Sequence, residues 1–110
     1  MTRIMTSSWS LHQTLGQSMY QWPDPKGPPV LQGTGKGELT LLDLPAQLAR
    51  RDIGMVEFCH FHFARLDDGY LSELRQTLAE NGVELFSILI DAGDITHQDG
   101  AQRKNEVVWI

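Results

Sequence analysis

Two histidines stand two residues apart in the segment EFCHFHF, residues 57–63. Side chains alternate between the two faces of a β-strand, so a strand here would direct His60 and His62 to the same face. Such a pair can begin a metal site, contact a substrate, or form structural hydrogen bonds at the rim of a sheet. A metal site needs three or four ligands, and no second cluster of His or Cys follows. We therefore interpret the pair first as the wall of a substrate pocket.

Further polar side chains are expected at the ends of other strands. Asp91 and Asp94, in the segment DAGD, directly follow the apolar run LFSILI. Asp91 is expected to orient a substrate hydroxyl, and Asp94 is expected either to do the same or to cap the next helix or turn. His12 ends the short alternating segment SSWSLH, where pocket and rim stay open alternatives. The candidate substrate-binding residues are therefore His12, His60, His62, Asp91 and Asp94.

Three neighbouring side chains are interpreted differently. Glu57 is expected on the strand face opposite the two histidines, as an interior ion pair or as a pocket carboxylate, because a buried carboxylate must be paired or have a raised pKa. Cys59 is expected to be a small buried hydrophobe. Trp9 is expected in the core, with packing over a ligand ring as the alternative.

Hydrophobic periodicity divides the chain into alternating strands and helices. The expected elements are a strand at about 7–12, a loop at 17–38, a helix at 43–52, a strand at about 55–62, a helix at 68–81, a strand at about 84–91 and a helix at 98–110. The apolar run Leu85–Ile90 is typical of a strand covered on both faces. Strands that alternate with helices predict an α/β fold with parallel strands and right-handed crossovers.

Residue types at the helix ends support this division. Asp43 is the expected N-cap of the first helix, and Pro45 suits its first turn because proline has no N–H to leave unpaired. Asp67 or Asp68 is the expected N-cap of the second helix. Gly82 is expected to end that helix in the left-handed conformation.

The segment 20–38 contains four Pro and four Gly in nineteen residues, a density that neither helix nor sheet tolerates. We expect a long loop here, which could act as a lid. Its GTGKG motif at 33–37 does not fit a phosphate loop, because Gly37 stands where Ser or Thr is required. Its evenly spaced glycines do not fit the dinucleotide-binding pattern either. A nucleotide site is therefore not expected.

Composition limits the classes of partner. The 110 residues are 41% hydrophobic and 21% charged, with a formal net charge of −5, which suits one ordinary soluble domain. Without a run of Lys or Arg, neither nucleic acid nor a membrane surface is an expected partner. No apolar run approaches the roughly 20 residues that span a bilayer, and the start lacks a secretory signal. A single cysteine excludes an internal disulfide, so the expected location is cytoplasmic.

Three segments together resemble the sugar phosphate isomerase/epimerase family, the xylose-isomerase-like TIM barrels: SSWSLHQTLG, EFCHFHF and YLSELRQTLAENGVELFSILIDAGDIT. The resemblance spans nearly all of the chain, and its third βα unit is the most specific part. It implies a (β/α)8 barrel of about 250 residues, of which this chain would form the three N-terminal βα units, apparently truncated. It also implies a divalent metal (Mn, Mg, Zn or Co), with its ligands on later strands outside this chain.

The resemblance implies an isomerase or epimerase that moves a proton between carbonyl and hydroxyl carbons of a sugar, sugar phosphate or polyol. This chain would supply the wall of the substrate pocket, and no catalytic residue is assigned to it. A metal-dependent hydrolase or an apurinic-site endonuclease-like barrel is a neighbouring alternative, although the acidic charge disfavours DNA. Outside the enzymes, the chain could be a non-catalytic fragment or a small βαβαβ module that binds a ligand, a partner or a second copy through its open sheet edge. The isolated chain is expected to be inactive.

Overall fold

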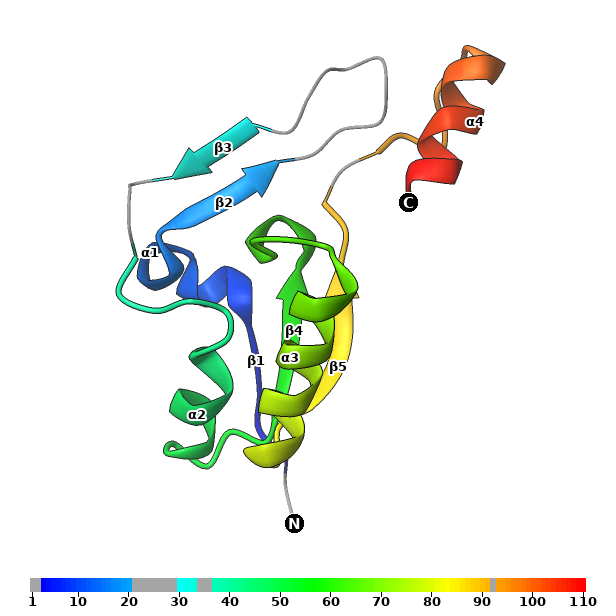
Figure 1. Cartoon of the computed structure of the whole chain (residues 1–110). Coiled ribbons are helices and arrows are strands. Elements are labelled where there is room, and N and C mark those ends of the chain that lie inside the picture. Colours follow the sequence, from blue (N-terminus) through cyan, green and yellow to red (C-terminus); the bar gives the residue numbers. More distant parts are fainter. Residues whose placement is uncertain (1–2, 21–29, 34–36, 92) are drawn as a thin grey trace.

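The computed structural model describes residues 3–20, 30–33, 37–91 and 93–110, with the backbone alone for 17–20 and 30–33. The elements in chain order are β1 (Met5–Ser7), the 3₁₀ turn η1 (Ser8–Leu11), α1 (His12–Leu15), β2 (Gln17–Tyr20), β3 (Val30–Gly33), α2 (Leu44–Ala49), β4 (Met55–Cys59), the 3₁₀ turn η2 (His60–His62), α3 (Asp68–Glu80), β5 (Glu84–Leu89) and α4 (Gly100–Trp109). Figure 1 shows their arrangement. Among the described residues, no helix is long and apolar enough to cross a membrane.

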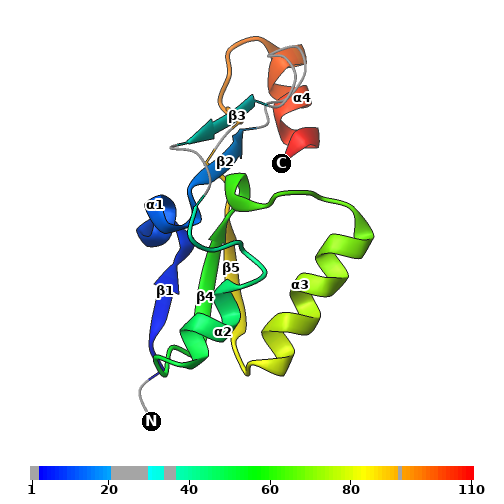
Figure 2. The same cartoon turned by 60° about the vertical axis from the view of Figure 1, so that its left-hand side comes forward.

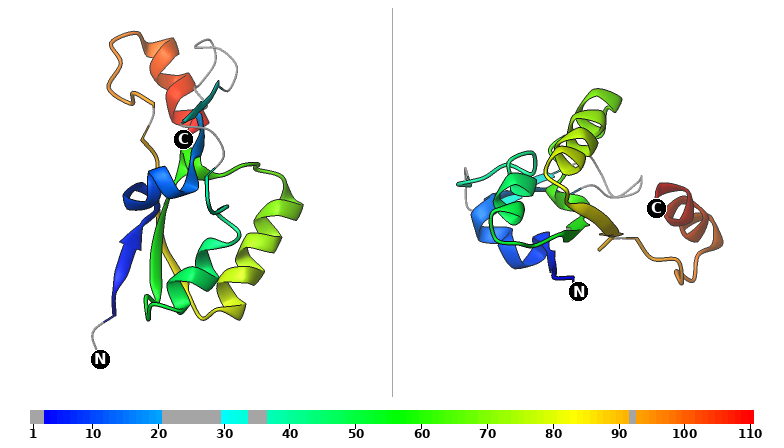
Figure 3. Two further views of the ribbon diagram at one scale, coloured as in Figure 1. Left: turned by 90° about the vertical axis from the view of Figure 1, so that its left-hand side faces the viewer. Right: turned by 90° about the horizontal axis from the view of Figure 1, so that it is seen from below.

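β1, β4 and β5 form a parallel sheet in the order β1-β4-β5. The connecting helices α2 and α3 lie on the same face of this sheet (Figures 1 and 3). The three strands follow one another in chain order, so each connecting helix joins two neighbouring strands. The predicted α/β class is confirmed as an open, three-stranded parallel sheet.

The core lies between the sheet and its two helices. Val56 and Phe58 of β4 have no exposed surface and belong to one cluster of buried apolar side chains with Leu48 of α2 and Leu74 of α3. The ring of Phe63 extends this core past the end of β4, edge-on to Phe58 with centroids 5.8 Å apart. Full burial of one such apolar side chain stabilises the fold by about 1.5–3 kcal/mol.

The outer strand β5 is exposed. Leu85, Phe86 and Ile88 have exposed fractions of 37%, 59% and 50%. The prediction that this strand is covered on both faces is therefore wrong for the part of the chain that the structure describes. The reason is the position of α4, which lies beyond the carboxyl ends of the strands instead of packing on β5 (Figure 2). β1 and β5 are the two edges of the sheet as described.

All three strands of the sheet end earlier than predicted. β1 ends at Ser7 instead of residue 12, β4 ends at Cys59 instead of 62, and β5 ends at Leu89 instead of 91. After β1 the chain turns at once into η1, where the Ser7 hydroxyl oxygen accepts a hydrogen bond from the Trp9 N–H. The polar residues predicted at strand ends therefore lie in turns, which changes the direction of their side chains.

The helix α3 follows the prediction closely. Its N-cap is Asp67, whose carboxylate accepts a hydrogen bond from the Tyr70 N–H. It ends at Glu80, one residue before the predicted end, and Gly82 then adopts a φ of 63°. This left-handed conformation strains residues that carry a Cβ, so glycine ends the helix as predicted.

The other two predicted helices differ at their first turns. Asp43 is the N-cap residue of α2, as predicted, but its side chain makes no capping hydrogen bond, because its carboxylate accepts from the N–H and hydroxyl of Thr40 in the turn before the helix. These hydrogen bonds also lower the pKa of Asp43. α4 begins at Gly100 instead of residue 98, because Asp99 is its N-cap and accepts from the Gln102 N–H.

The Pro- and Gly-rich segment is not wholly a loop. β2 and β3 form an antiparallel hairpin over residues 17–20 and 30–33, which corrects the prediction of an irregular loop over 17–38. Residues 21–29 and 34–36 lie outside the described residues, and so do Trp22 and most of the GTGKG motif. The lid role of the segment stays a prediction.

The two ends of the hairpin segment meet at α1. The carbonyl oxygen of Thr14 accepts hydrogen bonds from the N–H groups of both Glu38 and Leu39. Gly37 lies so close to the backbone of Leu15 that a Cβ at this position would collide with it. Glycine is therefore required here by the close approach of two backbone segments.

Candidate functional site

The predicted site residues all lie just past the carboxyl ends of the parallel strands. His12 begins α1 after β1, His60 and His62 lie in η2 after β4, and Asp91 and Asp94 follow β5. Active sites of parallel α/β folds lie at this edge of the sheet, because the loops that follow the strands gather there. The structure divides the residues into two groups.

In the first group, His62 connects His12 to a buried serine that is not among the predicted site residues. His62 Nδ1 lies 2.7 Å from Ser8 Oγ, and His62 Nε2 lies 3.0 Å from His12 Nδ1. The N–H of Cys59 donates to the same serine oxygen over 2.8 Å. Ser8 and Cys59 are fully buried, as predicted for Cys59, and His62 is 6% exposed. We refer to these three side chains as the Ser8–His62–His12 chain.

His12 also belongs to an aromatic patch with Trp9 and Phe61. The Trp9 ring stacks on His12 with centroids 5.4 Å apart and 28° between the planes, and it packs edge-on against Phe61 at 5.3 Å. Phe61 is fully buried, but Trp9 is 51% exposed, so the prediction of Trp9 in the core is wrong. A half-exposed indole beside an imidazole suits a ring-shaped ligand with one apolar face.

His60 belongs to the second group, which contradicts the expectation that both imidazoles leave one strand face. The reason is the 3₁₀ geometry of η2, which replaces the two-residue alternation of a strand. His60 Nδ1 accepts a hydrogen bond from the Asp91 N–H over 3.2 Å, and its ring packs edge-on against Trp109 of α4 at 5.7 Å. Its Nε2 is buried without a hydrogen-bond partner among the described residues.

The two aspartates make different contacts. Asp91 is exposed, and it contacts His60 through its backbone N–H, not through its carboxyl group. Asp94 accepts hydrogen bonds at Oδ1 from the N–H and the hydroxyl of Thr96. Of its two predicted roles, Asp94 therefore has the one in a turn. The Asp94 N–H donates to Oε2 of Glu106, a fully buried residue of α4. These contacts connect α4 to the end of β5.

Glu57 lies in β4, where its side chain is half-buried. Its carboxylate accepts a hydrogen bond of 2.8 Å from the hydroxyl of Ser87 in β5, and within the described residues it has no ion-pair partner. Glu57 is paired with Ser87 in the parallel register, on the sheet face opposite the buried Val56 and Phe58. It therefore does not join the histidines.

Burial keeps both histidines of η2 neutral at pH 7. Burial, with smaller contributions from the repulsion that a protonated His62 meets when His12 or His60 is also protonated, lowers the pKa of His62 from 6.5 to about 4. Burial also lowers the pKa of His60, although the Leu89 backbone and the Asp91 charge act in the opposite direction. A neutral imidazole offers one donor and one acceptor, which suits hydroxyl groups better than anions.

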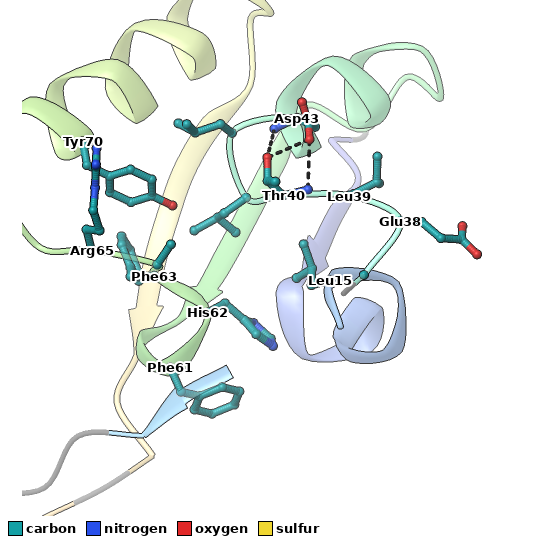
Figure 4. A pocket seen from close by; sticks show the side chains of 14 residues that line it. Leu15, Glu38, Leu39, Thr40, Asp43, Phe61, His62, Phe63, Arg65 and Tyr70 are labelled. Carbon is teal, nitrogen blue, oxygen red and sulfur yellow. Dashed lines mark hydrogen bonds between the residues drawn. The ribbon is translucent and has the colours of Figure 1, made fainter. Parts of the chain in front are cut away.

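A cavity of about 690 Å³ lies beside His62, between segments 37–43 and 61–65 (Figure 4). This volume falls within the range of about 300–1,000 Å³ that small-molecule sites occupy. Its wall is largely apolar, and its polar groups include His62, Arg65 and the Tyr70 hydroxyl, which points inward from α3 in Figure 4. Burial raises the pKa of Tyr70, so this hydroxyl stays protonated.

The histidines do not form a metal site. Among the described residues, no group of three His, Cys, Asp or Glu side chains is placed to hold a metal ion. The facing nitrogens of His12 and His62 share a hydrogen bond of 3.0 Å, so they do not converge on a common ion. The resemblance places the ligands of its divalent metal on later strands outside this chain, so none of these residues is assigned to the metal and no step is derived through it.

No family model matches this chain, and no match was found among curated proteins or solved structures. The resemblance to sugar phosphate isomerases therefore rests on the three sequence segments. The fold class and the contacts of the site rest on the structure.

Proposed function

We propose that this chain forms part of the substrate-binding wall of a sugar or sugar-phosphate isomerase or epimerase, built as a βα barrel. The observation that supports this most directly is the sheet, with its chain-ordered strands and its helices on one face. The carboxyl edge of that sheet carries the histidines, and one of them, His62, lines the cavity of about 690 Å³. This is the edge at which βα barrels bind their substrates.

The chemistry of these side chains suits a sugar or polyol. Sugar hydroxyls both donate and accept hydrogen bonds, which suits an imidazole such as that of His12, at the outer end of the Ser8–His62–His12 chain. The apolar C–H face of a sugar ring packs well on an indole, which matches the half-exposed Trp9. These residues would bind and orient the substrate. The transfer of a proton between carbonyl and hydroxyl carbons also needs a base, which we assign to none of the described residues.

The test is a titration of the full chain with aldoses, ketoses, polyols and sugar phosphates, followed by ¹H–¹⁵N NMR. We expect saturable shifts at residues 8–12 and 59–63, and weaker binding by His12→Ala. Gln13→Ala is the matched control, because Gln13 is exposed on the same short helix. Absence of a saturable shift at millimolar ligand, or equal binding by the two variants, would contradict the proposal.

A second candidate function is a module that associates through its open sheet edge. Phe86 of β5 and Val108 of α4 are 59% and 79% exposed, and β5 is an edge strand of the described sheet. Exposed apolar edge strands pair readily with other strands. Light scattering at several protein concentrations tests this function. Self-association reduced by Phe86→Glu would support it, and a monomer at every concentration would exclude pairing between copies.

A further inference from the structure

The Ser8–His62–His12 chain runs from a fully buried hydroxyl to the aromatic patch at the carboxyl edge of the sheet. Figure 4 shows His62 projecting from η2 into this region, near Leu15. Each imidazole in such a chain can carry its proton on either nitrogen, so two directions of donation exist. The contacts of Ser8 favour one of them.

Ser8 Oγ has two hydrogen-bonding contacts within the described residues, one with the Cys59 N–H and one with His62 Nδ1. The backbone N–H can only donate, so Ser8 Oγ accepts from Cys59. If His62 Nδ1 also donated to this oxygen, the Ser8 hydroxyl proton would be left without an acceptor in a fully buried position. Buried polar hydrogens without a partner are costly. Ser8 therefore donates to His62 Nδ1.

The remaining protons follow from this direction. His62 accepts at Nδ1, so its neutral ring carries the proton on Nε2 and donates it to His12 Nδ1 over 3.0 Å. His12 then accepts at Nδ1, and its neutral ring carries the proton on Nε2. The lowered pKa of His62 keeps its ring in the neutral form that this arrangement requires.

We propose that Ser8, through His62, sets the tautomer of His12, so that the His12 ring carries its proton on Nε2, which is then a hydrogen-bond donor and not a base. That the acceptor is a sugar oxygen rests on the proposed function, whereas the direction of donation along the chain rests on the contacts of Ser8 alone. Ser8 and His62 are positioning residues. His12 would select an acceptor, such as a carbonyl or ether oxygen, and its Nε2 would not act as a base.

The test uses the full chain with ¹⁵N-labelled histidine and long-range ¹H–¹⁵N correlation at neutral pH, which identifies the protonated nitrogen of each ring. We expect the Nε2–H tautomer for both His62 and His12. A Nδ1–H tautomer at either ring would overturn the proposal. This measurement needs no substitution and is therefore decisive even where variants fold poorly.

A pair of variants tests whether the hydrogen bond donated by Ser8, and not the packing around the rings, determines the tautomers of His62 and His12. Ser8→Ala removes the donor to His62 and should convert the single tautomer of both rings into a mixture. Ser10→Ala is the matched control, because Ser10 is exposed in the same turn η1. A folded Ser8→Ala chain that keeps the wild-type tautomers would overturn the proposal. Expected tautomers without sugar binding would contradict only the proposed function, and sugar binding with a Nδ1–H tautomer of His12 would contradict only this inference.

Discussion

Acidification is expected to destabilise this protein through His62. The pKa of His62 is about 4 in the folded chain, below its ordinary value of 6.5. The unfolded chain therefore binds the extra proton more readily, so the contribution of His62 to stability is complete above pH 6.5 and falls as the pH approaches 4. The two pKa values differ by about 2.5, and each pKa unit corresponds to about 1.36 kcal/mol, which sets an upper limit of about 3 kcal/mol.

The assay compares urea unfolding of the wild type and His62→Gln at several pH values from about 7 to about 4. Glutamine keeps a polar side chain but does not titrate, so the difference between the two pH profiles isolates His62 from the other acidic and basic groups. We expect the wild-type free energy of unfolding to fall more steeply, by about 2–3 kcal/mol over this interval. Gln13→Ala serves as control, because Gln13 is an exposed, non-titrating residue of α1, and it should keep the wild-type profile.

Two results would refute this reasoning. One is a pair of parallel pH profiles for the wild type and His62→Gln. The other is a direct NMR titration in which His62 takes up its proton at or above 6.5, since burial would then not disfavour the charged ring.

Three substitutions test the fold by urea unfolding. Phe58→Ala should cost about 3–5 kcal/mol, because this fully buried ring leaves a cavity; a loss below about 1 kcal/mol would mean that the site is not packed as described. Asp67→Ala should cost about 1 kcal/mol through the lost cap of α3, and unchanged stability would argue against that cap. Gly82→Ala should cost about 1 kcal/mol at its φ of 63°, whereas Gly54→Ala, with open space around it, is the control; equal effects would contradict the left-handed assignment.

Local patterns predicted the parts of the fold that local physics determines. The apolar segment at about 55–62 predicted a strand, which the structure has at Met55–Cys59, and Asp67 and Gly82 marked the two ends of α3. Each of these signals depends on neighbouring residues. The same holds for the order of elements, from which the parallel sheet follows.

The contacts of the site depend on residues far apart in the sequence, which local patterns do not report. Ser8 bonds to Cys59 and His62, which lie 51 and 54 positions further along the chain. Ser8 lay inside the strand predicted at about 7–12, so nothing in the sequence marked it as a partner of the histidines. The pair His60 and His62 was assigned to a strand because 3₁₀ turns have no strong pattern of their own. The hairpin β2–β3 was not predicted, because the high proline and glycine content of this segment indicates a loop.

The junction at Gly37 brings the chain after the hairpin β2–β3 back to the backbone of α1, where the hairpin begins. The two stems of the hairpin segment touch at the Thr14 carbonyl and the Leu15 backbone, so the distance between its anchor points does not depend on the length of chain between them. Replacing residues 17–36 by a short glycine linker should therefore leave β1, β4 and β5 in register. For the same reason, insertions, deletions or replacements in this segment could change the residues beside the site without changing the parallel sheet.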